Sequence, residues 1–389
     1  MMPDLQDQRA KLPLSCCSRQ SLCVLATLPP PVTGMTLATL HVVRSLQDSG
    51  DTLVHDWSVG SNPRRRFWRI IKAIRSIGSV FYLVFWRWNS SGILYTVANA
   101  GYGLYYNMFV ISCARLLGYR CILHHQVFSY LHQFDWRMNL IVRMMGRKGI
   151  QIVLAPEMKH RFHKLYGEMN EFFILPNTII MRQEDEQLKS GREWSSDKPM
   201  VLGHLSNLTI EKGLGHVIAS FERMRSMDLD VRLVLAGPVS GTRERSIIDN
   251  ALRIHGSRIE YRGPVYGTEK ARFFDDIDVF LFPTQYRNEA QPLVVAEAIS
   301  YGRPVIAYGL ACLPSLIGPS GGVVVPCDAD FAAEAADRVE EWVNNRERFF
   351  DIVQLVQSYS ETLRSEADLS MKRLVKLLRV ADDGQSSSL

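Results

Sequence analysis

Cysteine is scarce in this sequence, and its positions follow no recognisable spacing. The chain of 389 residues has seven cysteines, an odd number, and none of them forms a Cys-x-x-Cys pair. Disulfide-stabilised domains usually have an even number of cysteines, and structural zinc sites usually have closely spaced pairs. The sequence therefore predicts neither a disulfide framework nor a zinc site, and it favours a reducing compartment.

Long apolar runs are lacking as well. Residues 1–18 are polar and have no apolar core of the kind found in signal peptides, so we expect a disordered tail there. In the predicted helix at 64–88 only eleven uncharged residues separate Arg75 from Arg87, whereas a membrane-spanning helix needs about 20. Residues 88–114 have no formal charge, but they contain Asn and Ser residues and three glycines, so we expect a strand, a polar loop and a buried helix there. We therefore expect no spanning helix and a cytoplasmic protein.

The length and the charge distribution indicate two domains of different character. A chain of 389 residues is longer than one hydrophobic core usually organises. Residues 1–190 contain 22 Lys and Arg against 12 Asp and Glu, and the remainder contains 23 against 28. The basic first half suggests an anionic partner, which could be membrane lipid, a phosphate-bearing acceptor or nucleic acid.

Apolar runs of strand length alternate with helical patterns, which is typical of α/β domains with parallel sheets. A polar stretch at 183–198 separates two such groups. We therefore predict a Rossmann-like domain over 19–182, a linker, a second Rossmann-like domain over 199–380 and a frayed tail at 381–389. The predicted strands are residues 22–28, 93–97, 121–124, 152–155, 200–203, 231–236, 259–262, 279–282, 305–307 and 323–326.

Residues 286–307 show the clearest pattern of loop, helix and strand, directly after the predicted strand at 279–282. Glu289 falls in the loop and Glu297 in the second turn of the helix. Ligands of open parallel sheets bind at the carboxyl ends of the strands, and helix-start amides can receive a phosphate. The spacing alone is also compatible with no role in binding, if one glutamate is a solvated loop residue and the other a helix-capping residue. The helix begins with Pro292, Leu293 and Val294.

This stretch resembles the C-terminal signature of glycosyltransferase family 4, whose members have the GT-B fold. The matching residues are Glu289, Glu297, Gly302, Pro304, Val305 and Ile306. The resemblance extends over about residues 200–345 and, more weakly, over 20–180. It implies two facing Rossmann-like domains with a cleft between them, retention at the anomeric carbon and no required metal or cofactor. It also implies that Glu297 holds the ribose of a nucleotide and that Glu289 faces the transferred sugar.

The loop after the predicted strand at 200–203 contains Lys212, just before the next helix, where a lysine can neutralise a diphosphate. It resembles the family's Gly-Arg-Leu-x-x-x-Lys-Gly loop. His204 stands in place of the arginine, where we expect it to contact the donor, and the loop is two residues longer. Arg287 could replace the missing cation, or Asn207 could contribute N–H groups. A solvated loop lysine is the alternative interpretation of Lys212.

Three further positions lie at predicted carboxyl ends of strands. Gly34 is in a Pro/Gly-rich turn before a helix. The resemblance implies that this turn lies beside the donor phosphates, and the alternative is a turn with no role in binding. Gly237 follows the strand at 231–236 and is expected to face the cleft. His124 and His125 point opposite ways if their strand continues. We expect His125 to contact sugar or acceptor, with a pKa suited to proton transfer near neutrality.

Residues 64–88 predict a basic amphipathic helix, the pattern of an interfacial membrane binder. A surface helix with its apolar side in the core would show the same pattern. The basic face has Arg65, Arg69, Lys72 and Arg75, and the apolar face has Phe67, Ile71, Ile74, Ile77 and Phe81.

We therefore predict a retaining, metal-independent glycosyltransferase that moves a sugar from a nucleoside-diphosphate sugar to a glycan or lipid-linked acceptor. We expect a role in cell-surface polysaccharide synthesis, at the inner face of the plasma membrane if the helix binds lipid. The alternatives are a non-catalytic nucleotide-sugar-binding subunit at the membrane and a GT-B sugar-nucleotide epimerase. Nucleic-acid binding is disfavoured, because the arginines alternate with an apolar face.

Overall fold

The computed structural model describes residues 21–30, 33–50, 52–56, 68–87, 90–181 and 198–380. The predicted tails at 1–18 and 381–389 lie outside these residues, as do nearly all of the predicted linker at 183–198 and the arginines that precede Trp68. Within the described residues, no helix is long and apolar enough to cross a membrane.

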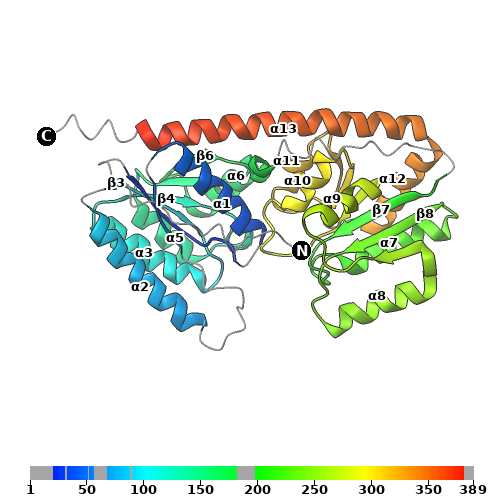
Figure 1. Ribbon diagram of the computed structural model, residues 1–389, viewed down its shortest axis with the longest axis horizontal. Helices are drawn as coiled ribbons and strands as arrows, with labels where there is room; N and C mark the ends of the chain where they lie inside the picture. The colour runs from blue at the N-terminus through cyan, green and yellow to red at the C-terminus, as the bar shows by residue number, and fades with distance from the viewer. Residues whose placement is uncertain are drawn as a thin grey trace.

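Two parallel sheets of six strands each form the centres of two α/β domains, which confirms the predicted fold class (Figure 1). The strand order is β2-β1-β3-β4-β5-β6 in the first sheet and β12-β11-β10-β7-β8-β9 in the second. The first sheet has β1 (Ser21–Ala26), β2 (Thr52–Asp56), β3 (Ser90–Val97), β4 (Arg120–His124), β5 (Ile150–Val153) and β6 (Glu171–Ile174). The second has β7 (Met200–Leu205), β8 (Val231–Ala236), β9 (Ile259–Tyr261), β10 (Val279–Phe282), β11 (Val305–Tyr308) and β12 (Gly322–Val325).

Helices connect the strands and cover the sheets (Figure 1). In the N-terminal domain they are α1 (Gly34–Asp48), α2 (Trp68–Trp86), α3 (Gly103–Leu116), α4 (Ser129–His132), α5 (Trp136–Met145), α6 (Pro156–Tyr166) and the 3-10 helix η3 (Asn177–Ile180). In the C-terminal domain they are α7 (Leu214–Ser226), α8 (Thr242–His255), the 3-10 helix η5 (Gly256–Arg258), α9 (Gly267–Asp276), α10 (Leu293–Ser300), α11 (Leu313–Ile317), α12 (Phe331–Asn344) and α13 (Arg346–Val380).

The strands that the sequence did not predict are β2 and β6, the two edges of the first sheet. Each of the five residues of β2 is half-buried, and β6 begins and ends with an exposed residue. An edge strand is covered on fewer sides, so it needs no continuous apolar run. The strands β8 and β10, whose residues are buried almost throughout, begin and end as predicted.

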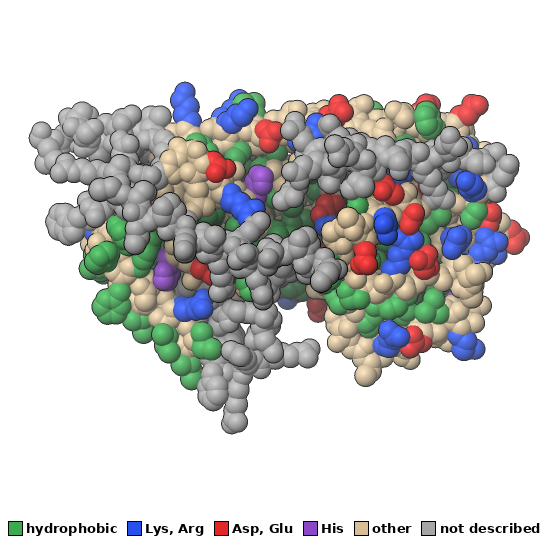
Figure 2. Space-filling view, viewed as in Figure 1, with side chains coloured by type: hydrophobic (Ala, Val, Ile, Leu, Met, Phe, Trp, Pro, Cys, Tyr) green, Lys and Arg blue, Asp and Glu red, His purple; other side chains and the backbone are tan. Residues whose placement is uncertain are grey.

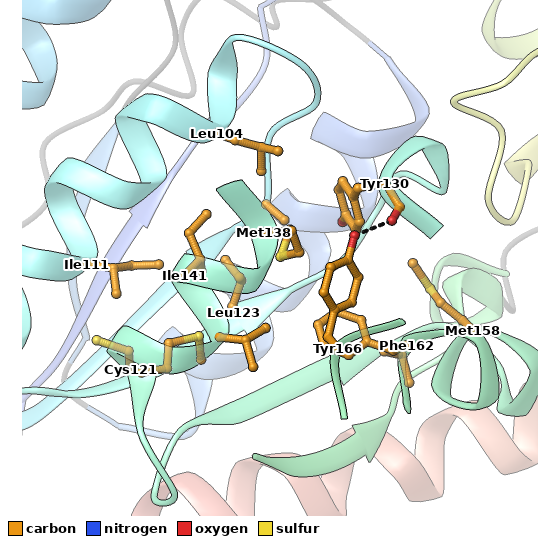
Figure 3. Packing of buried hydrophobic residues seen from close by; sticks show 14 of the residues in the cluster. Leu104, Ile111, Cys121, Leu123, Tyr130, Met138, Ile141, Met158, Phe162 and Tyr166 are labelled. Carbon is orange, nitrogen blue, oxygen red and sulfur yellow. Dashed lines mark hydrogen bonds between the residues drawn. The ribbon is translucent and has the colours of Figure 1, made fainter. Parts of the chain in front are cut away.

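The core of the N-terminal domain packs helices α3, α5 and α6 against one face of the sheet. Figure 3 shows Leu104 and Ile111 of α3 close to Met138 and Ile141 of α5, with Leu123 of β4 beneath them. These side chains are fully buried. A core of this size fixes the position of the loops that follow β4 and β5.

Helix α13 crosses from the C-terminal domain to the N-terminal domain (Figure 1). Val353 and Val356 pack in the C-terminal domain, whereas Ala367, Met371 and Leu374 pack against the first sheet. The sequence assigned all of 199–380 to the second domain, and for the end of α13 this assignment is wrong. An amphipathic pattern shows that a helix buries one face but not which domain covers it.

The two domains contact each other at several points beside the strand ends. The amide Nδ2 of Asn177 in η3 donates to the carbonyl oxygen of Gln291 at 3.0 Å, just before α10. Ser315 in α11 donates to Glu157 in α6. A Cβ placed on Gly34 would lie 3.5 Å from Cγ of Leu293, so the N-termini of α1 and α10 meet across the domain boundary.

Candidate active site

The central feature of the site is an ion pair between Lys212 and Glu289, which are 77 residues apart. Lys212 lies in the loop after β7, and Glu289 lies in the loop after β10. Since β7 and β10 are paired parallel strands, their carboxyl ends open at the same place. The side chains are 19% and 11% exposed, so the pair is largely shielded from water but still open to a ligand.

Tyr286 and Thr284 complete the surroundings of this pair. The Lys212 ammonium lies 4.5 Å from the ring centroid of Tyr286, close enough for a cation–π interaction. The hydroxyl of Thr284 approaches Oε2 of Glu289 at 3.5 Å. The pair thus provides a cation for a phosphate and an acceptor for sugar hydroxyls in one place. The sequence predicted both charged residues but not that they pair with each other.

Glu297 also has a basic partner, which the sequence did not single out. Lys270 of α9 forms an ion pair with Oε1 of Glu297 on α10, and the side chains are 33% and 26% exposed. Lys270 is one of several lysines on amphipathic helices, so no local motif distinguishes it. Only the packing of α9 beside α10 reveals its contact with the second glutamate of the signature.

The N-terminus of α10 is available to an anion. Among the described residues no side chain hydrogen-bonds to the N-terminus of this helix, whereas the first turn of α1 is capped by its own Thr33 and Thr36. Pro292 is the N-cap of α10, one position before the first helical residue, and it has no N–H of its own. The first amides of α10 are therefore those of Leu293 and Val294, which have no partner within the helix.

His204 is not a phosphate ligand in this structure. It lies in β7, which continues to Leu205, and its side chain is fully buried. Nδ1 donates to the carbonyl oxygen of Leu281 at 2.8 Å, so Nε2 accepts from the hydroxyl of Ser206 at 2.9 Å. Burial lowers the pKa of His204 to about 4, and the ring is neutral at physiological pH. The prediction that it contacts the donor is wrong, because the strand extends further than expected.

The neutral histidine instead positions the loop that follows it. Ser206 is held through its hydroxyl, and Asn207 beside it is exposed. Gly237 has a φ of +121°, and a Cβ there would lie 1.8 Å from the carbonyl oxygen of Ser206. The two loops after β7 and β8 therefore touch only because residue 237 is glycine. Ser206 is a candidate donor contact that the sequence did not identify.

Arg287 is exposed on the loop between β10 and α10. Its carbonyl oxygen accepts a hydrogen bond of 3.0 Å from Nε2 of His132 in α4, across the domain boundary. Desolvation lowers the pKa of His132 despite this hydrogen bond. The loop that contains Glu289 is thus attached to the N-terminal domain at Arg287, before α10 begins at Leu293, and the exposed Arg287 side chain can reach solvent or ligand.

The expectation for His125 is wrong. It is fully buried, with Nδ1 2.7 Å from the hydroxyl of Tyr130 and Nε2 2.7 Å from Oε1 of Gln151. Since the Gln151 oxygen can only accept, Nε2 donates and Nδ1 accepts from Tyr130. Burial lowers the pKa of His125 to about 4, far from neutrality. The adjacent His124 is buried too, hydrogen-bonded to Tyr95 at 2.6 Å, so neither histidine faces the cleft.

Acidic residues of the kind that bind metals are used structurally. The sequence has three Asp-x-Asp triplets, which end at Asp230, Asp278 and Asp330. Asp230 pairs with Arg258, Asp278 accepts from the backbone N–H of Val201 at 2.7 Å, and Asp330 caps α12. Across the described part of the chain, no group of three or more His, Cys, Asp or Glu side chains could hold a metal ion.

A pocket of about 410 Å³ lies on the N-terminal side of the site. The C-terminal domain contributes Asn288, the residue before Glu289, whose amide donates to the Tyr286 hydroxyl at 3.0 Å. The N-terminal domain contributes an ion pair of Asp135 and Arg137, joined by bonds of 2.6 and 2.9 Å. Its further lining includes Tyr130, Gln133 and Phe134. This polar and aromatic pocket adjoins the loop of Glu289.

Comparison with known proteins agrees with this geometry. Residues 199–345 match the protein family described as "Glycosyl transferases group 1". Sucrose-phosphate synthase from Thermosynechococcus elongatus is 14% identical, with a TM-score of 0.71 over 93% of this chain and all of that one. HepE of Anabaena, solved with UDP and glucose, is 14% identical, with a TM-score of 0.65 over 92% of this chain and 99% of that one. Among curated proteins, none matches the chain by sequence.

The fold and the family match together define the class of protein, which is a glycosyltransferase with the GT-B fold. More particularly, the match to group 1 glycosyl transferases lies in its C-terminal domain, over residues 199–345, and includes the signature from Glu289 to Ile306.

Proposed function

We propose that this protein transfers a sugar from a UDP-sugar to an acceptor hydroxyl, with retention of anomeric configuration and without a metal. The observation that carries the proposal is the Lys212–Glu289 pair at the uncapped N-terminus of α10. It combines a phosphate-binding cation, phosphate-binding amides and a sugar-binding carboxylate at adjacent strand ends.

The donor would bind with its diphosphate between Lys212 and the first amides of α10. Lys212 would pair with the bound phosphate instead of with Glu289. The Glu289 carboxylate would then be free to accept hydrogen bonds from the sugar hydroxyls. Glu297 would accept from the ribose hydroxyls, with Lys270 holding its carboxylate in place. The nucleotide is proposed to be UDP because the similar HepE structures contain UDP, UDP and glucose, or UDP-glucose.

The leaving UDP gains negative charge as the glycosidic bond breaks. Lys212 and the helix-start amides of Leu293 and Val294 would stabilise that charge directly, so the reaction as proposed needs no metal. Closure of the two domains, which already meet at Gly34 and Leu293, would keep water from the donor. Retention rests on the family resemblance, and the anomeric configuration of the product by NMR tests it.

The acceptor is proposed to occupy the pocket beside Asn288. Carbohydrates stack on aromatic rings and exchange hydrogen bonds with planar charged groups, and the pocket offers Phe134 together with the Asp135–Arg137 pair. This composition favours a glycan portion in the acceptor. The free cysteines among the described residues are consistent with action on the cytoplasmic side of a membrane, in the assembly of a cell-surface polysaccharide.

The test is thermal unfolding with UDP, GDP, ADP, CMP and dTDP, each with and without magnesium, followed by a hydrolysis and transfer assay with UDP-sugars. A ligand that binds only the folded state adds about 2.7 kcal/mol of stability at a hundredfold excess over its Kd. We expect a magnesium-independent shift with UDP that Lys212→Ala removes. A shift with another nucleotide would change the donor, and binding without any hydrolysis or transfer would favour a non-catalytic subunit.

A further inference from the structure

Helix α2 exposes its apolar residues to solvent. Six large apolar side chains recur at intervals of four, three, four, three and one residues, so they share one face of the helix. We call this set the apolar face of α2, and its members are between 48% and 73% exposed. They are Ile70, Ile74, Ile77, Phe81, Val84 and Phe85.

The opposite face of α2 is buried although it is largely polar. Lys72, Ser76 and Ser79 are at most 5% exposed, and Leu83 is fully buried beside them. Tyr82 and Trp86, which are partly buried, pack on the same core. The hydroxyls of Ser76 and Ser79 donate to helix carbonyls four residues earlier, each at 2.8 Å, which permits their burial. An ordinary surface helix has the reverse arrangement, and Lys72, which the sequence placed on the basic face, is buried.

The sequence around α2 is rich in basic residues. From residue 57 to residue 134 the sequence contains nine Lys and Arg and no Asp or Glu. Three of the nine, Arg64, Arg65 and Arg66, immediately precede α2 in the sequence. Some of this charge is balanced in the fold, since Asp56 acts on Lys72 and Glu171 pairs with Arg120. An apolar face on a segment with a net excess of basic residues is complementary to a surface that is anionic outside and apolar beneath.

The same charge pattern disfavours a second copy of this chain as the partner. In a symmetric dimer, the same patch from both subunits meets face to face. Two copies of this segment would bring together two net excesses of basic residues, because residues 57–134 contribute nine Lys and Arg and no Asp or Glu. A bilayer that contains anionic lipids has no such repulsion.

We propose that the apolar face of α2 docks on an anionic lipid bilayer, and that the acceptor is lipid-linked. Figure 2 shows hydrophobic side chains along the edge of the N-terminal domain where Figure 1 places α2. Helix α2 packs on α3, and α3 packs on α5. Exposed aromatic residues continue there: Tyr105 lies 6.4 Å from Tyr102 and 6.1 Å from Trp136, between ring centroids.

This aromatic group leads to the acceptor pocket, because Arg137, which lines the pocket, also lies over the Tyr105 ring at 5.5 Å. A bilayer against α2 would bring the head of a lipid-linked acceptor to the pocket side of the domain while its chain stays in the membrane. None of the described helices could span a membrane. In this proposal α2 therefore lies in the interface between the lipid and water. The acceptor part of this inference rests on the proposed function.

The test is flotation of the full-length protein with vesicles of phosphatidylcholine, with or without phosphatidylglycerol. We expect binding to the anionic vesicles that weakens as salt is raised. Ile74→Ser combined with Phe81→Ser should lower the affinity about a hundredfold, which is about 2.8 kcal/mol at 1.4 kcal/mol per factor of ten. Both residues are exposed, at 63% and 71%, so the variant should unfold at the wild-type temperature.

The matched control is Ile254→Ser combined with Tyr266→Ser. These residues are 54% and 56% exposed in the C-terminal domain, and their substitution should leave flotation unchanged. No flotation of the wild type, or equal flotation of the α2 variant, would overturn the proposal. A fall from dimer to monomer in the α2 variant by light scattering would assign the face to a second copy instead.

A transfer assay separates this inference from the proposed function. With a lipid-linked acceptor in vesicles, the α2 variant should be slower than wild type, whereas hydrolysis of UDP-sugar in solution should be unchanged. Loss of UDP binding in the wild type would contradict the proposed function but not the docking surface. Normal transfer to a water-soluble glycan together with vesicle binding that does not depend on α2 would contradict only the docking surface.

Discussion

Substitution of Lys212 by alanine tests the assignment of the site most directly. It removes the cation proposed to bind the diphosphate and leaves the Glu289 carboxylate, which is 11% exposed, without its basic partner. Loss of one charge-stabilising donor typically lowers kcat by about 10²–10³, or about 2.7–4 kcal/mol. We expect a loss of that size in transfer from a UDP-sugar, together with loss of the UDP-induced thermal shift.

The same substitution should also destabilise the protein without ligand. A largely buried group that loses its hydrogen-bonding partner costs about 1–3 kcal/mol. Glu289→Gln should cost less, because Lys212 would keep its contact with the Tyr286 ring at 4.5 Å. In the double variant Lys212→Ala/Glu289→Gln no unpaired charge remains, so stability should recover while transfer stays low.

Urea unfolding of the four proteins measures the stability part, and steady-state kinetics with UDP-sugar measures the catalytic part. If Lys212→Ala keeps the wild-type kcat and the UDP shift, the site is assigned wrongly. If the double variant recovers activity as well as stability, the pair stabilises the fold and does not act on the substrate.

Three other predictions concern separate parts of the site. Glu297→Ala should weaken UDP binding by about tenfold to a hundredfold, because it removes a charge-assisted hydrogen bond of about 1.5–3 kcal/mol. Lys270→Ala should have a smaller effect, because it removes only the partner of Glu297. If calorimetry gives Glu297→Ala the same UDP affinity as wild type, Glu297 does not contact the ribose. Gly237→Ala should lower the free energy of unfolding in urea by more than about 2 kcal/mol, because its Cβ would collide with the Ser206 carbonyl. The control Gly256→Ala has a φ of +53° and no atom within 4 Å of the new Cβ, so it should lose only the backbone cost of about 1–2 kcal/mol. Equal losses of stability in the two variants would mean that the structure relieves the collision. The pKa of His125 is about 4 in the folded protein against an ordinary 6.5, so the unfolded chain takes up the proton first. The free energy of unfolding should therefore fall by up to about 3 kcal/mol as pH falls from 6.5 through 4. His125→Gln should flatten this part of the pH profile measured in urea, and an unchanged slope would contradict a buried neutral ring.

Local patterns in the sequence were sufficient for the elements that lie in the middle of each sheet. A central parallel strand is covered on both faces, so β8 and β10 are continuous apolar runs that can be read directly. The signature from Glu289 to Ile306 is local too, because it describes one strand end, one helix and the next strand. This is why the fold class, the glycosyltransferase domain and the loop positions of Lys212 and Glu289 could be predicted.

The positions of His125 and His204 could not be predicted, because the first depends on packing by other elements and the second on where a strand ends. One or two further residues of β7 turn His204 into the sheet, where its ring bonds to Leu281 and Ser206. His125 follows β4 directly, yet Tyr130 and Gln151 enclose it from two other elements. Adjacent residues in an extended chain point to opposite faces, so a small error at a strand end changes which face receives a side chain.

The sequence by itself determined the number of domains, the α/β class and the charged residues that define the candidate donor site. Only the tertiary structure decided which charges meet, as in the pairs Lys212–Glu289 and Lys270–Glu297, and which face of α2 is turned outward. The physical reason is that periodicity specifies the angular relation of side chains within one element. The identity of the partner is set by the packing of another element, from a distant part of the chain, against one side of it.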